Sequence, residues 1–240
     1  MNHKTLLVGL ILAAGFTTLA EEVSARPRGG RAQGTVTRQR QPGQAQRTYQ
    51  GTRTGAQGKT SQVNRNSTTQ RTGPNTFSRQ GQQTVTGPNG QQRTQQSQGT
   101  GTVQRTEDGY TKTYDGTITT DKGKTIDVNR TTDVTKNADG SKSRDSTGTY
   151  TNSQGEVIGT GQSNSTYTPG QGTQTTKSYT NSQDKTWNYE GQSSQVAPGE
   201  RQMQGTVTNP QGNSRGVQGR VRWQKIDGKW VRMTEGSTIP

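Results

Sequence analysis

One short unit recurs along the chain: a threonine, any residue, a second threonine and then a turn. It is clearest in 84–90, which reads Thr-Val-Thr-Gly-Pro-Asn-Gly, and it returns in 206–212 as Thr-Val-Thr-Asn-Pro-Gln-Gly. Copies follow one another about every 16 residues, which is the length of one strand plus one turn. A repeat with this period indicates that every unit folds alike and contacts chiefly its neighbours.

Strand alternation and turn chemistry both accompany the repeat. In 110–119, Tyr110, Lys112 and Tyr114 fall on one face, while threonine and aspartate fall on the other. Asp-Gly, Pro-Gly and Gln-Gly pairs separate such segments and place glycine where a tight turn needs a positive φ. The sequence therefore predicts an all-β fold, an extended antiparallel meander of strand-turn repeats of about 16 residues that forms a single-layer sheet.

Composition limits how much this chain can bury. Hydrophobic residues make up 20% and aromatic residues 5% of the 240 residues, with 33 glycines and a mean hydropathy of −1.20. Little apolar surface is available to offset the entropy of ordering the chain, which disfavours a two-layer sandwich with a wide core.

Two other repetitive architectures suit the sequence less well than the meander. A parallel solenoid would stack the middle residue of every unit in one interior column, which Arg53, Gly101 and Tyr150 do not suit. An outer-membrane barrel matches the strand length and the short turns, but it would place apolar side chains and several cations against lipid, at about 2–4 kcal/mol for each cation. The cations on the apolar face are Lys112, Arg144, Lys177 and Arg201. These residues exclude such a barrel at the level of sequence.

Residues 1–25 are typical of a secretory signal. Lys4 precedes an apolar run, and Val23-Ser24-Ala25 offers small residues for cleavage. The run is too short to span a bilayer, and no transmembrane segment is expected in the mature chain. We expect a secreted protein of the periplasm, cell surface or extracellular space, without disulfides because cysteine is absent.

Positive charge is concentrated in the first part of the mature chain. Between residues 26 and 106 the sequence carries twelve arginines and Lys59 but no aspartate or glutamate. Residues 26–83, rich in Arg, Gln and Thr, predict a largely disordered basic arm with degenerate repeats, and 84–240 a β-repeat region. The arm is expected to bind acidic polysaccharide, lipopolysaccharide or extracellular DNA; the alternative is that its charge only keeps the chain soluble. The candidate contacts are Arg26, Arg28, Arg31, Arg38, Arg40, Arg47, Arg53, Arg65, Arg71 and Arg79.

The last hairpin, 220–232, is the most aromatic and cationic part of the array. As a terminal unit it is expected to cap the sheet, and its rings and cations also make it a candidate surface contact for carbohydrate or lipid headgroups. The residues concerned are Arg220, Arg222, Trp223, Trp230 and Arg232.

Reactive side chains are scarce. His3 is the only histidine and lies in the signal, and cysteine is absent, so the mature chain has no imidazole or thiol for a base, a nucleophile or a soft metal site. Acidic residues such as Asp108 and Asp139 belong to turns, where Asp-Gly has a structural reason. We expect no enzyme activity, no cofactor and no metal site.

The unit at 84–90, with its echoes at 70–75 and 206–212, resembles a group of uncharacterised secreted bacterial Thr/Gly-rich β-repeat proteins. The resemblance covers most of the mature chain and implies an envelope or extracellular setting. It brings no activity or site residues.

These observations favour a secreted, non-catalytic structural or adhesive protein of the cell surface or matrix, held to acidic polymers by its basic arm. Two alternatives stay open. Open sheet edges allow a self-assembling, amyloid-like extracellular fibre, and a flat array of threonines allows an ice-binding protein.

Overall fold

The computed structural model describes residues 31–55, 58–226 and 229–239, which form fourteen β-strands in one sheet. The signal predicted for 1–25, and Arg26 and Arg28 of the predicted arm, lie outside the described residues. The strands are β1 (Arg31–Gln41), β2 (Gln44–Thr54), β3 (Thr60–Arg71), β4 (Thr76–Thr86), β5 (Gln92–Arg105), β6 (Gly109–Thr120), β7 (Thr125–Lys136), β8 (Lys142–Asn152), β9 (Val157–Thr168), β10 (Gly172–Asn181), β11 (Thr186–Ala197), β12 (Glu200–Thr208), β13 (Ser214–Ile226) and β14 (Lys229–Ile239).

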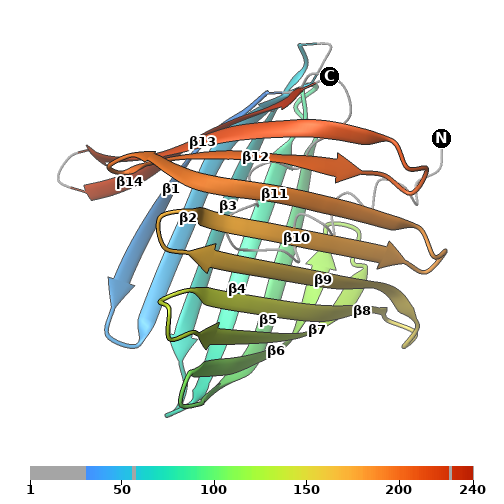
Figure 1. Ribbon diagram of the computed structural model, residues 1–240. Helices are drawn as coiled ribbons and strands as arrows, with labels where there is room; N and C mark the ends of the chain where they lie inside the picture. The colour runs from blue at the N-terminus through green and yellow to red at the C-terminus, as the bar shows by residue number, and fades with distance from the viewer. Residues whose placement is uncertain (1–30, 56–57, 227–228, 240) are drawn as a thin grey trace.

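Each strand pairs antiparallel with the next along the chain, and β14 pairs with β1 to close a barrel (Figure 1). The all-β, antiparallel part of the prediction is confirmed. The open single-layer meander is wrong, because the sheet curls until its first and last strands meet, between Arg31↔Ser237 and Val36↔Arg232. Closure removes most of the sheet edge that an open meander would expose.

Burial shows which face of the sheet points inward. Every buried strand residue falls on the same alternating face, from Val36 on β1 through Ile126 on β7 to Val221 on β13. A single closed sheet covers side chains only on its concave side, so this face lines the lumen. The opposite face of the described strands carries mainly threonine, glutamine, asparagine, serine and aspartate.

The sequence-based prediction that the chain does not form a barrel is wrong, because it assigned the apolar face to the wrong side of the sheet. That inference placed the apolar face against lipid, where Lys112 and Arg144 would be costly. In the structure the apolar face is the inner one, so both side chains point into the lumen. The cations therefore do not oppose closure.

The predicted disordered arm is also wrong where the structure describes it. Residues 31–54 form β1 and β2, and residues 60–71 and 76–86 form β3 and β4. Small and polar side chains suffice there because each inner face needs only a few buried anchors, such as Val36, Val63 and Phe77. The arginines between these anchors belong to the barrel wall.

The turns follow the chemistry that the sequence indicates. Gly155 and Gly212 have φ of 82° and 81°, a left-handed conformation that glycine adopts without a steric penalty. In the turn of 182–185, which has no glycine, Asp184 takes φ 56° instead. Asn181 supports that turn, since its side-chain oxygen accepts hydrogen bonds from the backbone nitrogens of Gln183 and Lys185 at 2.9 and 3.0 Å.

The main apolar cluster lies inside the barrel, in strands β6 to β11. Ile118 and Ile126 flank the β6–β7 turn, and Tyr150 and Tyr179 pack against them with 3% and 1% of their surface exposed. The rings of Tyr150 and Tyr179 meet edge to face, with centroids 6.0 Å apart. This cluster occupies the end of the lumen opposite the β5–β6 turn, and it is a small core of the kind that a chain with few apolar residues can afford.

Candidate functional site

Hydrogen bonds on the outer face fix the register between β6 and β7, and this register directs one face of β6 into the lumen. Thr111 donates to Asp133 at 2.6 Å, Thr117 donates to Asp127 at 2.8 Å, and the Asn129 amide donates to Asp115 at 2.6 Å. A slip of one residue would break these bonds and turn every side chain to the other face. The outer ladder of Thr, Asn and Asp therefore holds Tyr110, Lys112 and Tyr114 inward.

Four basic side chains gather in the lumen around Lys112, from strands β4, β6, β7 and β8. We call Arg79, Lys112, Arg130 and Arg144 the Lys112 cluster. Lys112 Nζ lies 4.2 Å from the centroid of the Phe77 ring, a cation–π contact. The cluster lies toward the β5–β6 turn, so one end of the lumen is cationic while the other is apolar.

Crowding of like charges is visible in the electrostatics of the cluster. Burial lowers the pKa of Lys112, and the charges of Arg79, Arg144 and Arg130 lower it further. Burial also lowers the pKa of Arg144, which neighbouring Tyr110 partly offsets. An anion in this part of the lumen would oppose both effects, so the cluster is an environment that favours negative charge.

In the apolar cluster at the other end of the lumen, burial raises the pKa of Tyr150 to about 12; the Arg130 charge opposes the shift and Tyr179 adds to it. The folded barrel thus keeps a proton that the unfolded chain releases near its ordinary value of 10.0. Stability from this group is complete below about pH 10 and is lost as the pH rises toward 12, by about 2–3 kcal/mol.

Urea unfolding between about pH 9 and 12 checks this prediction. The unaltered chain is expected to lose stability more steeply than Tyr150→Phe, and the difference between the two curves isolates Tyr150 from the other buried tyrosines. Parallel curves would contradict the prediction.

Basic side chains line the lumen well beyond the Lys112 cluster. On the described strands every aspartate and glutamate points outward, and those that remain lie in turns. The inner face is therefore uniformly basic among its charged residues. Its basic residues are Arg38, Arg40, Arg47, Arg53, Arg65, Arg71, Arg79, Arg93, Arg105, Lys112, Arg130, Lys136, Lys142, Arg144, Lys177, Arg201, Arg215 and Arg232.

The arginines predicted for a flexible arm are thus collected in one lumen rather than displayed along a coil. Of the predicted contacts, Arg31 begins β1, and seven others lie on the inner face of β1 to β4. These are Arg38, Arg40, Arg47, Arg53, Arg65, Arg71 and Arg79. Arg71 also bonds its own turn, through Gly73 O at 2.9 Å and Pro74 O at 2.8 Å.

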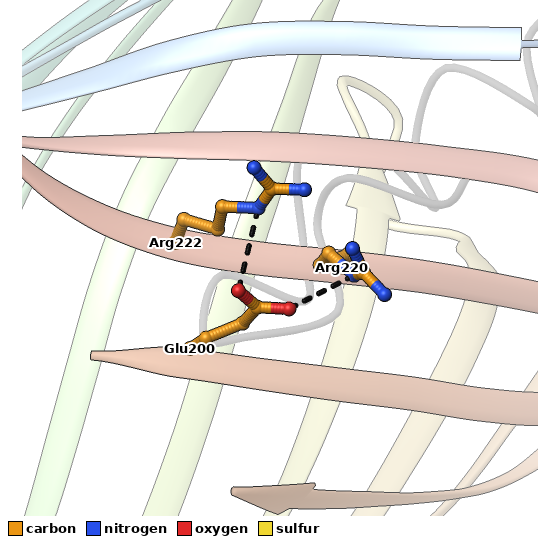
Figure 2. A network of polar contacts seen from close by, with 3 residues as sticks. All are labelled: Glu200, Arg220 and Arg222. Atoms are coloured by element: carbon orange, nitrogen blue, oxygen red, sulfur yellow. Dashed lines mark ion pairs between the residues drawn. The ribbon is translucent and has the colours of Figure 1, made fainter. Parts of the chain in front are cut away.

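The structure separates the residues predicted for the last hairpin. Arg220 and Arg222 lie on the outer face, where both pair with Glu200 at 3.1 and 3.5 Å (Figure 2). Trp223 and Arg232 lie on the inner face, and Arg232 is buried. Trp230 lies in β14. Arg220 and Arg222 therefore do not share a surface with Trp223 and Arg232.

Sequence reasoning missed the basic residues of β5 to β8 as site residues, among them Lys112, Arg130 and Arg144. A signal for them was present. On β5 to β8 the basic residues keep the parity of the buried apolar residues, and the aspartates keep the opposite parity. If the face that carries the basic and apolar residues is taken as a lumen rather than as a lipid-facing surface, this segregation of charge indicates the site.

A polar groove of about 600 Å³ crosses the outer face of β4 to β8. Its side chains include Gln80, Gln98, Asp115 and Asp127. Both carboxylates already accept hydrogen bonds from the neighbouring strand, so the groove is largely accounted for by the outer ladder.

The function predicted from the sequence needs correction on three points. The basic segment forms barrel wall rather than an arm that holds a matrix or adhesive protein to polymers. The predicted self-assembling fibre is wrong because β1 pairs with β14, so the closed sheet lacks the two full-length open edges from which a fibre would grow. The outer threonines stand on a closed, curved wall rather than on a flat array, which removes the basis for ice binding.

Comparisons with known proteins add little. No known family matches the chain, and no curated protein matches it. Among solved structures it is similar to a porin-like protein from Bacteroides uniformis ATCC 8492, with 8% identity over 89% of this chain and 98% of that chain and a TM-score of 0.14. A TM-score this low does not establish a common fold. The resemblance to uncharacterised secreted bacterial Thr/Gly-rich β-repeat proteins is wrong, since no known family matches and the sheet is a closed barrel.

Within the described residues no helix is long and apolar enough to cross a membrane. The same residues contain no group of three or more His, Cys, Asp or Glu side chains placed to hold a metal ion.

Proposed function

We propose that this protein is a non-catalytic binding barrel of the cell envelope that holds an anionic ligand in its lumen. The observation that carries the proposal is the segregation of charge across the wall. Most basic side chains of the described strands lie inside, Arg220 and Arg222 pair with Glu200 on the outside, and every acidic side chain lies outside or in a turn. A concave, low-dielectric wall lined by one sign of charge focuses its field on the lumen and concentrates counter-ions there.

The Lys112 cluster is the part of the lumen best suited to bind such a ligand. Three guanidinium groups supply planar pairs of donors for phosphate, sulfate or carboxylate, and Lys112 supplies a compact charge. Bringing an anion close to these groups relieves the crowding that lowers the pKa of Lys112. The partners expected from the sequence, an acidic polysaccharide, lipopolysaccharide or extracellular DNA, all carry such groups.

The outer face supports an aqueous setting within the envelope. A barrel that spans a bilayer needs an apolar outer band of about 25 Å. The described outer faces instead carry Thr, Gln, Asn and Asp along their length. The predicted signal at 1–25 supports export, and the proposed place of action is the periplasm or the outside of the cell.

Calorimetric titration with inorganic tripolyphosphate tests the proposal, with neutral dextran as the control ligand. We expect tripolyphosphate to bind, and its affinity to fall at least tenfold between about 50 and 200 mM salt because the contacts are ionic. Dextran is expected not to bind. Absence of tripolyphosphate binding at low salt, or an affinity that does not change with salt, would overturn the proposal.

A further inference from the structure

The seam that closes the barrel is incomplete at one end. β1 and β14 pair from Arg31↔Ser237 to Val36↔Arg232 and no further. Both strands continue past that point, because β1 stays paired with β2 as far as Gln41↔Gln44 and β14 stays paired with β13 as far as Ile226↔Lys229. In Figure 1 the blue β1–β2 hairpin and the red end of β13 and β14 diverge on the left of the view.

Along residues 37–41, β1 therefore pairs with β2 on one edge, and no strand of the described barrel pairs with its other edge. Alternate backbone N–H and C=O groups of such an edge point away from the sheet and can pair with an added strand. An extended peptide that adds to a sheet edge gains affinity from these main-chain bonds and specificity from alternate side chains. The splayed seam offers this geometry at the lumen end that carries the Lys112 cluster.

Basic residues around the seam favour a peptide with acidic side chains. Arg38 and Arg40 occupy the inner face of the open edge, and Trp223 is 38% exposed with its ring centroid 6.0 Å from the Arg38 guanidinium carbon. Two copies joined through these edges would bring like charges together, whereas a peptide with acidic residues at alternate positions would place them toward Arg38 and Arg40.

We propose that the open seam between residues 37–41 of β1 and the start of β14 binds an extended acidic peptide segment of a partner protein, which adds to β1 as a further strand. Its acidic side chains face Arg38 and Arg40, and the side chains between them face outward beside Thr37, Gln39 and Gln41. This inference stands apart from the lumenal ligand, because it depends on main-chain pairing.

A synthetic peptide of alternating threonine and glutamate, blocked at both ends, tests the inference by fluorescence anisotropy. Two further peptides have the same sequence with alternate backbone nitrogens methylated, one in each of the two possible registers. Both keep the charge, but only one of them loses the N–H donors on the edge that pairs with β1. We expect one methylated peptide to bind at least tenfold more weakly than the unmethylated peptide. Equal binding of all three peptides, or no binding, would overturn the proposal.

Variants of the barrel test whether the peptide binds at the seam. Arg40→Glu is expected to weaken peptide binding at least tenfold, while Lys122→Glu in the β6–β7 turn, at the other end of the barrel, leaves it unchanged. A lumenal double variant, Lys112→Gln with Arg144→Gln, is expected to retain the peptide even if it loses tripolyphosphate. Loss of the peptide in Lys122→Glu, or in the lumenal variant with its fold intact, would instead indicate general attraction to positive charge and would contradict strand addition.

Discussion

A barrel that carries Lys112→Gln and Arg144→Gln together is expected to bind tripolyphosphate about 100-fold more weakly than the unaltered chain, while unfolding no more easily. Each substitution removes a charge-assisted contact to the anion, and such contacts are worth about 1.5–3 kcal/mol each. Both side chains are partly buried beside other cations, and burial lowers the pKa of each, so removing their charges relieves crowding that disfavours the folded state. Binding and stability are therefore expected to separate.

The matched control is Lys122→Gln with Lys185→Gln, which removes the same formal charge from two exposed turns. Titration with tripolyphosphate and urea unfolding are measured on both double variants. The control is expected to stay within about threefold of the unaltered affinity, because exposed charges a Debye length away are screened. If both variants lose the same affinity, net charge rather than the Lys112 cluster holds the anion, and the assignment of the cluster is wrong.

Gly99→Val is expected to destabilise the barrel by about 3 kcal/mol or more, enough to impair folding. A Cβ atom at Gly99 would lie 2.6 Å from the Cα atom of Gly116 and against the backbone oxygen of Asp115, on the neighbouring strand. That backbone belongs to the ladder between β5 and β6, so it cannot move aside without breaking hydrogen bonds. The two facing glycines permit the close approach of strands that curls the sheet inward.

Gly148→Val is the control for this prediction. Gly148 also lies in mid-strand on the inner face, yet a Cβ there would have Asn129 O at 3.5 Å as its nearest neighbour. Valine suits a strand and restricts the unfolded chain, so a gain of about 0.5–1 kcal/mol is expected. Denaturant unfolding followed by far-UV circular dichroism measures both variants. Equal losses at the two positions would show that the close contact at Gly99 is not what constrains the curl.

Strands, turns and the sidedness of each strand were open to prediction from the sequence. The alternation of Tyr110, Lys112 and Tyr114 with threonine and aspartate places them on one face, and the structure keeps them there. The positive φ of Gly155 follows from its place in a turn. Such features depend on neighbours a few residues apart, which a repeat displays directly.

The basic segment shows where local reasoning failed. Residues 31–54 look too polar to fold alone, because Val36 and Tyr49 are their few large apolar side chains. In the barrel, Val36 faces Tyr49 on β2 and Arg232 on β14, so both sides of the strand are covered. Order in this segment depends on contact with the last strand of the chain, which no local pattern encodes.

The sequence by itself determined that this chain would be a repetitive antiparallel β-structure, with its cations and apolar residues on one face and its threonines and acids on the other. Only the tertiary structure decided which face is concave. Curvature arises from the accumulated twist of many strands and from close approaches such as Gly99 to Gly116, and both are properties of the whole sheet. Because the sheet curves toward the face that carries the cations, that face becomes a basic lumen, and the candidate site lies in it.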